Sequence, residues 1–329
     1  MAENPSDLEQ LRRRIDEIDD RLQDLLIERV GVVSQVAAHK ASNAGVAAHQ
    51  PAREAEIIRR LLRHNRGGFP AGTLVRIWRE LLAATVRLQS NFAVAVYAGP
   101  EAQGYWDLAR DHYGSHTRML AFRSTAQVIR AVTEGQAAVG VLPMPQDEEP
   151  DPWWRHLFSA HDNAPHVIAR LPFGPRGNAR AEGGDALAIG RGPHHETGQD
   201  RTLFVTENAV NISRGRIFST LTGLGLSCTF MASCEDADGP STFPNTLIEL
   251  DGFIAPSDPR LESFREQLGR ALAGLLPFGG YAMPLDAASA NRLSATPASS
   301  SPARPTGEAS ATPPGAPKAG APKAGAPKD

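Results

Sequence analysis

The chain contains very little cysteine and no long uninterrupted apolar run. Only two cysteines occur among 329 residues, and the spacing of Cys228 and Cys234 fits neither a redox CxxC pair nor a zinc knuckle. No stretch reaches the roughly 18 apolar residues that a membrane span requires, and no charged-then-apolar leader is evident. We therefore expect a cytoplasmic protein with free thiols and no membrane partner.

A strong charge of one sign is also missing, because the formal net charge is only -3. The chain therefore lacks the excess of basic residues that is typical of proteins that bind nucleic acid, and we expect no nucleic-acid partner. With 41% hydrophobic residues over 329 positions, the chain is long enough for two or three packed domains.

Lysine is almost confined to the C-terminal tail. The 34 lysines and arginines include only four lysines, and Lys40 is the only one within the first 317 residues. Ammonium is a compact charge with three freely aimed donors, whereas guanidinium is planar and bulky. Two interpretations stay open at this point. Lys40 serves a site that arginine would not suit, or it is an unselected cation near a helix end.

Apolar spacing predicts three helices in the first 92 residues. From Leu8 to Lys40 apolar residues recur every three or four positions without a proline, which predicts a helix about 50 Å long. A helix of that length needs a partner helix to cover its apolar stripe. A second helix begins at Pro51 and ends before Gly67, and a third covers about residues 70–92.

Polar side chains interrupt the apolar faces of these helices. At about 100° per residue, the two cations of the first helix share a face with valines. Together the six polar positions would form a mostly cationic, donor-rich pocket, whose natural ligand is a small dianion with an oxygen that needs a hydrogen bond. Taken singly, Thr85 and Gln89 could instead form a solvated strip. These residues are Arg29, Lys40, Arg53, Glu54, Thr85 and Gln89.

Arg12 lies too far from Arg29 to share a pocket with it in one chain. The 17 positions between them correspond to about 25 Å along the helix axis and roughly 100° around it. Arg12 could serve the pocket of a partner chain if two such helices pair antiparallel. The alternative is that it belongs to an exposed run of three arginines.

The helical region closely resembles the all-helical class of chorismate mutase, over about the first 92 residues. The resemblance rests on the segments LRRRIDEIDDRLQDLLIERVGVVSQVAAHK, PAREAEII and ELLAATVRLQ. It implies an intertwined helical homodimer that converts chorismate to prephenate by a Claisen rearrangement, without cofactor or metal. A dimeric scaffold or amino-acid sensor is the alternative from another class, although a scaffold has no reason to keep this set of polar residues.

The resemblance also implies a role for each polar residue. A pericyclic rearrangement needs no nucleophile or general base, so the site must position the substrate and stabilise developing charge. The two carboxylates of the substrate would be clamped by Arg29, Arg53 and Arg12 from the partner chain. The ether oxygen would accept hydrogen bonds from Lys40 and Gln89. Glu54 would accept a hydrogen bond from the ring hydroxyl, and the hydroxyl of Thr85 would help to position the substrate.

Beyond residue 92 strands alternate with helices, which is typical of an α/β domain with parallel pairing. The domain order resembles the bifunctional chorismate mutase-prephenate dehydratase proteins, but the dehydratase motifs are eroded. Ala102–Tyr105 stands where that family has Gly-Ser-Tyr-Ser, and Gly184–Ala186 stands where it has Thr-Arg-Phe. We expect residues 93–200 to be a reduced α/β region without dehydratase activity. Activity retained through the substituted residues is the alternative.

The last third of the chain is expected to form a small module and a tail. Residues 201–286 predict a βαββαβ order similar to the phenylalanine-sensing ACT domain, with phenylalanine binding weak or lost. Residues 287–329, rich in Ala, Pro, Lys and Gly, predict disorder because they cannot bury enough apolar surface. We expect His194-His195-Glu196 to be a solvated loop rather than a metal site, and Trp153-Trp154 to be an anchor.

Overall fold

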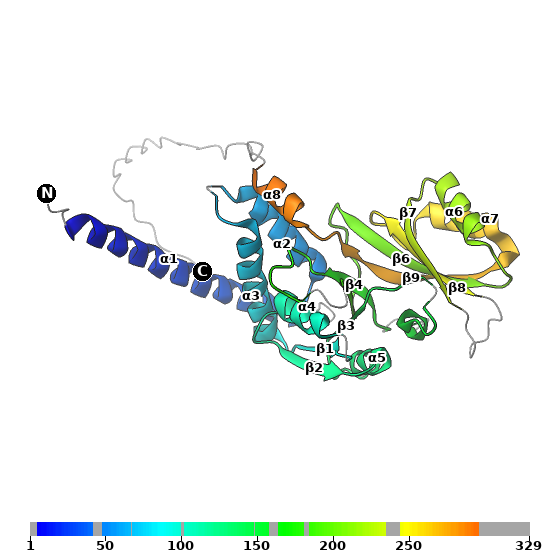
Figure 1. The fold of residues 1–329 in the computed structure, drawn as a ribbon, viewed down its shortest axis with the longest axis horizontal. Helices are drawn as coiled ribbons and strands as arrows, with labels where there is room; N and C mark the ends of the chain where they lie inside the picture. The colour runs from blue at the N-terminus through cyan, green and yellow to red at the C-terminus, as the bar shows by residue number, and fades with distance from the viewer. Residues whose placement is uncertain are drawn as a thin grey trace, which may run out of the picture. The chain divides into compact units, whose positions relative to one another are not determined.

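The fold is an all-helical N-terminal region followed by a mixed sheet with helices on both faces (Figure 1). The predicted order of a helical and then an α/β region is confirmed. The computed structural model describes residues 5–41, 48–66, 68–99, 102–147, 149–157, 164–180, 184–234 and 244–295.

The three predicted helices are present as α1 (Pro5–Ala41), α2 (Pro51–His64) and α3 (Ala71–Gln89). Their ends follow local signals in the sequence. Pro51 occupies the first turn of α2, where its missing N–H costs nothing, and basic residues occupy the last turn, where they suit the helix dipole. α2 and α3 pack on each other through an apolar cluster that includes Ile58 and Leu82.

A further helix, at the end of the described chain, packs on this cluster. Residues Ala287–Ala295 form α8, so the prediction of disorder from residue 287 is wrong for this segment. Ala290 is fully buried and Leu293 packs against the same cluster as α2 and α3. Asp286 accepts a hydrogen bond from the Ser289 backbone N–H at 2.6 Å, as an N-terminal cap does. The predicted disorder of residues 296–329 concerns positions outside the described residues.

In the described part of the chain, nine strands form a sheet in the order β2-β1-β3-β5-β4-β9-β6-β8-β7. β1 pairs in parallel with β2 and β3, as predicted, whereas β5 pairs antiparallel with β3 and β4. The strands are β1 (Ala93–Tyr97), β2 (Arg118–Phe122), β3 (Val139–Pro143), β4 (His166–Leu171), β5 (Ala186–Gly190), β6 (Asp200–Asn208), β7 (Cys228–Cys234), β8 (Asn245–Asp251) and β9 (Leu272–Ala282).

Helices cover both faces of the N-terminal half of the sheet. Successive strand residues point to opposite faces, and the buried residues of β1 divide accordingly. Val94 and Val96 pack with Leu108 of α4 (Gln103–Tyr113). Ala95 packs in the cluster that includes α5 (Thr125–Thr133) and the short helix η1 (Trp153–Leu157).

The C-terminal half of the sheet belongs to a βαββαβ unit, which has the predicted order of elements. It comprises β6, α6 (Arg214–Gly223), β7, β8, α7 (Pro259–Leu268) and β9, with antiparallel pairing throughout. α6 and α7 cover one face of these strands. On the other face, the ring of Trp153 lies 6.4 Å from that of Phe278, and both Trp153 and Trp154 are buried. The predicted anchoring role of the tryptophans is confirmed, while the ACT-like assignment stays a prediction.

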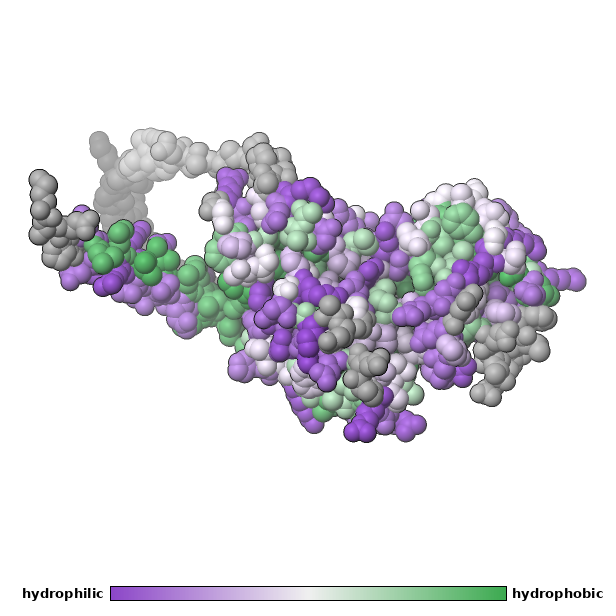
Figure 2. Space-filling model, viewed as in Figure 1, coloured by the Kyte–Doolittle hydropathy of each residue, from purple (hydrophilic) through white to green (hydrophobic). Residues whose placement is uncertain are grey.

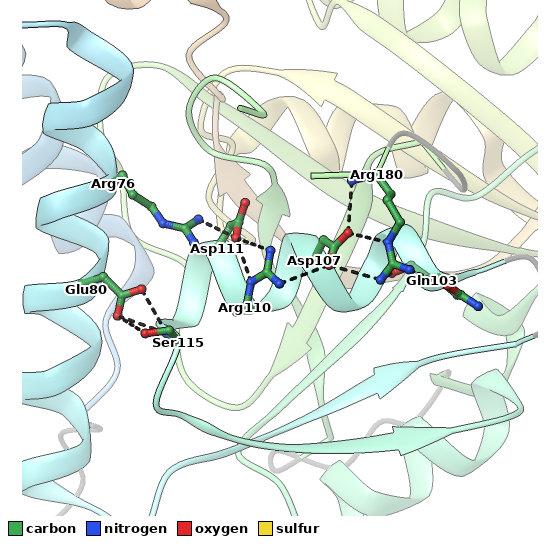
Figure 3. A network of polar contacts seen from close by, with 8 residues as sticks. All are labelled: Arg76, Glu80, Gln103, Asp107, Arg110, Asp111, Ser115 and Arg180. Carbon is green, nitrogen blue, oxygen red and sulfur yellow. Dashed lines mark hydrogen bonds and ion pairs between the residues drawn. The ribbon is translucent and has the colours of Figure 1, made fainter. Parts of the chain in front are cut away.

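Polar contacts join α3 to the α/β region (Figure 3). Arg76 forms an ion pair with Asp111 at 2.5 Å, and Glu80 accepts hydrogen bonds from the Ser115 backbone N–H at 3.0 Å. Gly114 permits this close approach because its φ is 86° and a Cβ there would lie 2.7 Å from that of Ala83. The joint therefore holds the first half and the middle of α3 against the α/β region, before the two predicted site residues of that helix.

Candidate functional site

The predicted site residues of α1 lie along a helix that packs only partly on the rest of the chain. Arg12 is exposed, whereas Arg29 is half-buried, with its guanidinium carbon 5.5 Å from the ring centroid of Trp78 on α3. Burial lowers the pKa of Arg29, although the group remains a cation at neutral pH. The side chain of Lys40 lies outside the described residues.

The two predicted site residues of α2 point in different directions. Consecutive helix residues are about 100° apart, so neighbours occupy different faces. The side chain of Arg53 is 63% exposed and pairs with Glu56 at 3.0 Å. Glu54 is buried on another face of the helix, where Arg79 of α3 donates a hydrogen bond to it at 2.9 Å. The single chain therefore separates a pair of residues that we expected in one pocket.

Arg79 is the residue that sequence reasoning missed. It is 4% exposed, and its guanidinium carbon lies 4.9 Å from the ring centroid of Phe173, stacked over that ring. Burial lowers its pKa, and the charge of Glu54 opposes that shift. An arginine among the apolar residues of RIWRELL was the available signal, because a buried cation requires a partner.

Three further titratable side chains surround this ion pair. His49 Nε2 lies 3.9 Å from the nearer oxygen of Glu54, and the rings of His49 and Tyr113 are 5.6 Å apart. Burial lowers the pKa of both His49 and His112 and raises that of Tyr113. The two imidazoles are therefore neutral at pH 7, and Glu54 and Arg79 carry the charges of the cluster.

Thr85 and Gln89 follow each other on the last two turns of α3. Thr85 is buried, and its hydroxyl donates to the carbonyl of Leu82 at 2.8 Å. Gln89 is half-buried, and its amide nitrogen donates to the carbonyl of Thr85 at 2.9 Å. The second amide hydrogen of Gln89 leaves it able to donate to a ligand.

The three helices present cations and neutral donors on separate faces. The described residues contain no group of three His, Cys, Asp or Glu side chains that could hold a metal ion. None of the helices in the described part of the chain is long and apolar enough to cross a membrane. The arrangement is suited to holding an anionic ligand by hydrogen bonds and charge once the separated faces are brought together.

The helical region is similar to a known family of chorismate mutases. Residues 11–90 match the family described as "Chorismate mutase type II". The match covers α2, α3 and most of α1, so the expected resemblance of this region is confirmed.

Related proteins from two bacteria share a name that gives two activities. The chain is 33% identical over 142 residues to the "Bifunctional chorismate mutase/prephenate dehydratase" of Aquifex aeolicus (strain VF5), which is 42% of this chain and 39% of that protein. It is 30% identical over 146 residues to the protein of the same name from Stutzerimonas stutzeri, covering 43% and 40%. The matches thus span about two fifths of the length of these relatives.

Among solved structures, the chain is similar to prephenate dehydratase from Streptococcus mutans. The TM-score is 0.42 at 16% identity, and the match covers 58% of this chain and 98% of that one. A similarity of this size carries no inference about activity.

Proposed function

We propose that the chain is a chorismate mutase that converts chorismate to prephenate. The observation that supports this most is the family match over residues 11–90, because those helices contain every predicted site residue. The substrate is a dianion, and the helices offer arginines and neutral donors. An acceleration on the order of 10⁶, equivalent to about 8 kcal/mol, is within reach of positioning and electrostatic stabilisation combined.

In this proposal the residues act on the substrate without forming a covalent bond to it. Arg29 and Arg53, with Arg12 of the partner subunit, hold the two carboxylates in the compact chair that the rearrangement needs. Lys40 and Gln89 donate to the ether oxygen as it gains negative charge, so they bind the transition state more tightly than the substrate. Glu54 accepts a hydrogen bond from the ring hydroxyl, and Thr85 helps to position the substrate.

The site is proposed to be completed by a second copy of the chain. The apolar stripe of α1 is uncovered in the single chain, and Figure 2 shows hydrophobic residues gathered along this helix. Ile77 and Leu88 of α3 are exposed as well. The stripe consists of side chains that are between 37% and 63% exposed, spaced three and four residues apart as in a helix–helix seam. They are Leu8, Leu11, Ile15, Ile18, Leu22, Leu25 and Leu26.

A charge placed in this stripe is expected to separate the two copies. Leu22→Glu places like charges in an apolar seam, so the protein should change from a dimer to a monomer at micromolar concentration. Gln23→Glu is the matched control, because it adds the same charge at the next, polar position and should leave the dimer intact. Light scattering coupled to size exclusion measures both masses. A monomeric unsubstituted protein would contradict the dimer.

We propose that the regions after the mutase do not dehydrate prephenate. Asp185 stands where the dehydratase motif has arginine, and it is bound between Arg170 at 2.9 Å and Arg176 at 2.8 Å. At the other eroded motif, Arg180 donates to Asp107 at 2.7 Å and also contacts Gln103 (Figure 3). These charges are bound to one another rather than left available for the departing hydroxyl.

The same proposal assigns the parts of the chain. Residues 1–92 are the mutase, 93–200 a reduced dehydratase-like region and 201–286 an ACT-like module that persists as a packing unit. A cytoplasmic location fits the low cysteine content of the chain, because disulfides are rare in that compartment.

One incubation distinguishes this function from its alternatives. The purified full chain is mixed with chorismate, and the products are identified chromatographically before and after acid treatment. Accumulating prephenate supports the mutase alone, whereas phenylpyruvate formed without acid supports the bifunctional enzyme. Unchanged chorismate would leave a non-catalytic scaffold or sensor and contradict the proposal.

A further inference from the structure

One aromatic ring of the α/β region contacts two arginines of the helical region. Phe173 follows the end of β4, is 4% exposed and packs in the apolar cluster shared by α2, α3 and α8. The guanidinium carbon of Arg79 on α3 lies 4.9 Å from its ring centroid, and that of Arg59 on α2 lies 5.7 Å from it. Such contacts are attractive because the face of the ring is electron-rich, and burial strengthens them. The ring therefore restrains both arginines.

The position of Phe173 is itself set by the α/β region and the segment that follows β9. Its carbonyl accepts a hydrogen bond from the backbone N–H of Leu285 at 2.7 Å. The next residue, Gly174, brings the backbone close to α3, where a Cβ would lie 2.7 Å from a methyl carbon of Val75. The loop after β4 is therefore held tightly against the helix that carries Arg79.

Arg59 joins α2 to the same part of the molecule. It is 5% exposed, and it donates to the carbonyl of Gln199 at 3.0 Å and to that of Met283 at 2.9 Å. These carbonyls lie just before β6 and just after β9. Hydrogen bonds from a charged donor are roughly twice as strong as neutral ones. The helix that carries Glu54 is therefore fixed relative to Phe173 as well.

Arg79 transmits this restraint to Glu54. Its Nη1 donates to Oε2 of Glu54 at 2.9 Å, and both side chains are buried. The other carboxylate oxygen, Oε1, lies 3.9 Å from Nε2 of His49, beyond hydrogen-bond distance, and none of the described residues donates to it. Arg79 therefore holds one oxygen of Glu54 and leaves the other able to accept a hydrogen bond.

We propose that Arg79 is a positioning residue of the mutase site, and that the α/β region serves the mutase by holding Arg79 through Phe173. Glu54 then presents Oε1 to the ring hydroxyl of chorismate, an assignment that rests on the proposed mutase function. Arg79 and Phe173 act through Glu54 rather than on the substrate, because they limit the directions in which its carboxylate can point. The α/β region thus contributes to the mutase without a reaction of its own.

Kinetics of the full chain with two substrates test the positioning. The substrates are chorismate and an analogue with hydrogen in place of the ring hydroxyl, which Glu54 cannot bind. Arg79→Lys keeps the charge but loses the planar fork, so kcat/KM for chorismate should fall at least about 10-fold, the scale for a lost hydrogen bond to a charged group. Phe173→Leu should lower it at least about 3-fold. Neither variant should change kcat/KM for the analogue. Equal losses for both substrates would make the role merely structural and overturn the proposal.

Two controls separate positioning from stability. Phe264→Leu removes a fully buried ring in the cluster under α6 and α7, so kcat/KM for both substrates should stay unchanged. Adding Arg79→Lys to Glu54→Gln should cause little further loss for chorismate, because Arg79 acts through Glu54. Losses that multiply in the double variant would show that Arg79 acts independently of Glu54, which contradicts the proposal.

A spectroscopic signal that needs no turnover tests the contact itself. With ¹³C in the side-chain carboxyl of glutamate, the signal of Glu54 is identified by its absence in Glu54→Gln. It should shift in Arg79→Lys and in Phe173→Leu but not in Phe264→Leu. An unchanged signal in the first two variants would overturn the positioning whatever the activity. A protein that shows these shifts but never converts chorismate would refute the mutase function and leave the contact from Phe173 to Glu54 standing.

Discussion

Lys40→Ala is expected to lower kcat/KM for chorismate by at least about 10²-fold, the scale of loss when one preorganised donor to a developing oxyanion is removed. The ether oxygen gains negative charge as the C–O bond breaks, and a neighbouring ammonium stabilises that charge more in the transition state than in the substrate. Lys40 is the only lysine in the first 317 residues. The loss is measured by following chorismate through its ultraviolet absorbance.

Two further variants test whether Lys40 acts as a positioned hydrogen-bond donor or only as a positive charge. Lys40→Arg keeps the charge but replaces a compact donor with a planar fork, so its activity should also stay low. Arg130→Ala removes an exposed cation on α5, outside the helical region, and should leave the rate unchanged. If Lys40→Ala retains the activity of the intact protein, Lys40 has no role at the ether oxygen.

Arg79→Leu is expected to lower the free energy of unfolding by about 3–5 kcal/mol, because it leaves Glu54 buried without its partner. Adding Glu54→Leu to this variant should restore much of the stability, since no unpaired charge then remains inside. Mutase activity should stay low in the double variant, because the proposed acceptor of the ring hydroxyl is gone. Urea denaturation followed by circular dichroism gives the stabilities.

Arg76→Leu provides the matched control on the same helix. Its ion pair with Asp111 involves an arginine side chain that is 41% exposed, and exposed pairs contribute about 1 kcal/mol or less. Its unfolding free energy should therefore change little. Equal losses of unfolding free energy in Arg76→Leu and Arg79→Leu would contradict this prediction, because the buried Arg79–Glu54 pair would then contribute no more to stability than the exposed pair.

The helices of the first 92 residues could be predicted because their signals are local. Apolar spacing, Pro51 and the glycines after α2 define α1 to α3 without knowledge of distant contacts. α8 was missed because its composition resembles the tail, and its stability comes from packing Ala290 against α2 and α3. β2 likewise has a weak local signal, since it is short and half exposed and depends on pairing with β1.

The sequence identified candidate site residues but not their surroundings. Arg29, Arg53 and Glu54 stand out as charges that interrupt apolar helices, which is visible in the chain alone. That Glu54 points inward to Arg79 depends on how α2 and α3 pack against Phe173 and Tyr113. Those contacts link residues far apart in sequence, so helical periodicity cannot reveal them.

The central claim is a mutase site formed by two chains, and a mixed dimer tests it most directly. One chain carries Arg12→Ala and the other Arg29→Ala, with different tags so that only the mixed dimer is purified. Each variant alone should be nearly inactive. In the mixed dimer one site keeps both arginines, so the account predicts about half of the intact dimer's activity towards chorismate, as two-fold symmetry requires. A mixed dimer no more active than the separate variants would contradict it.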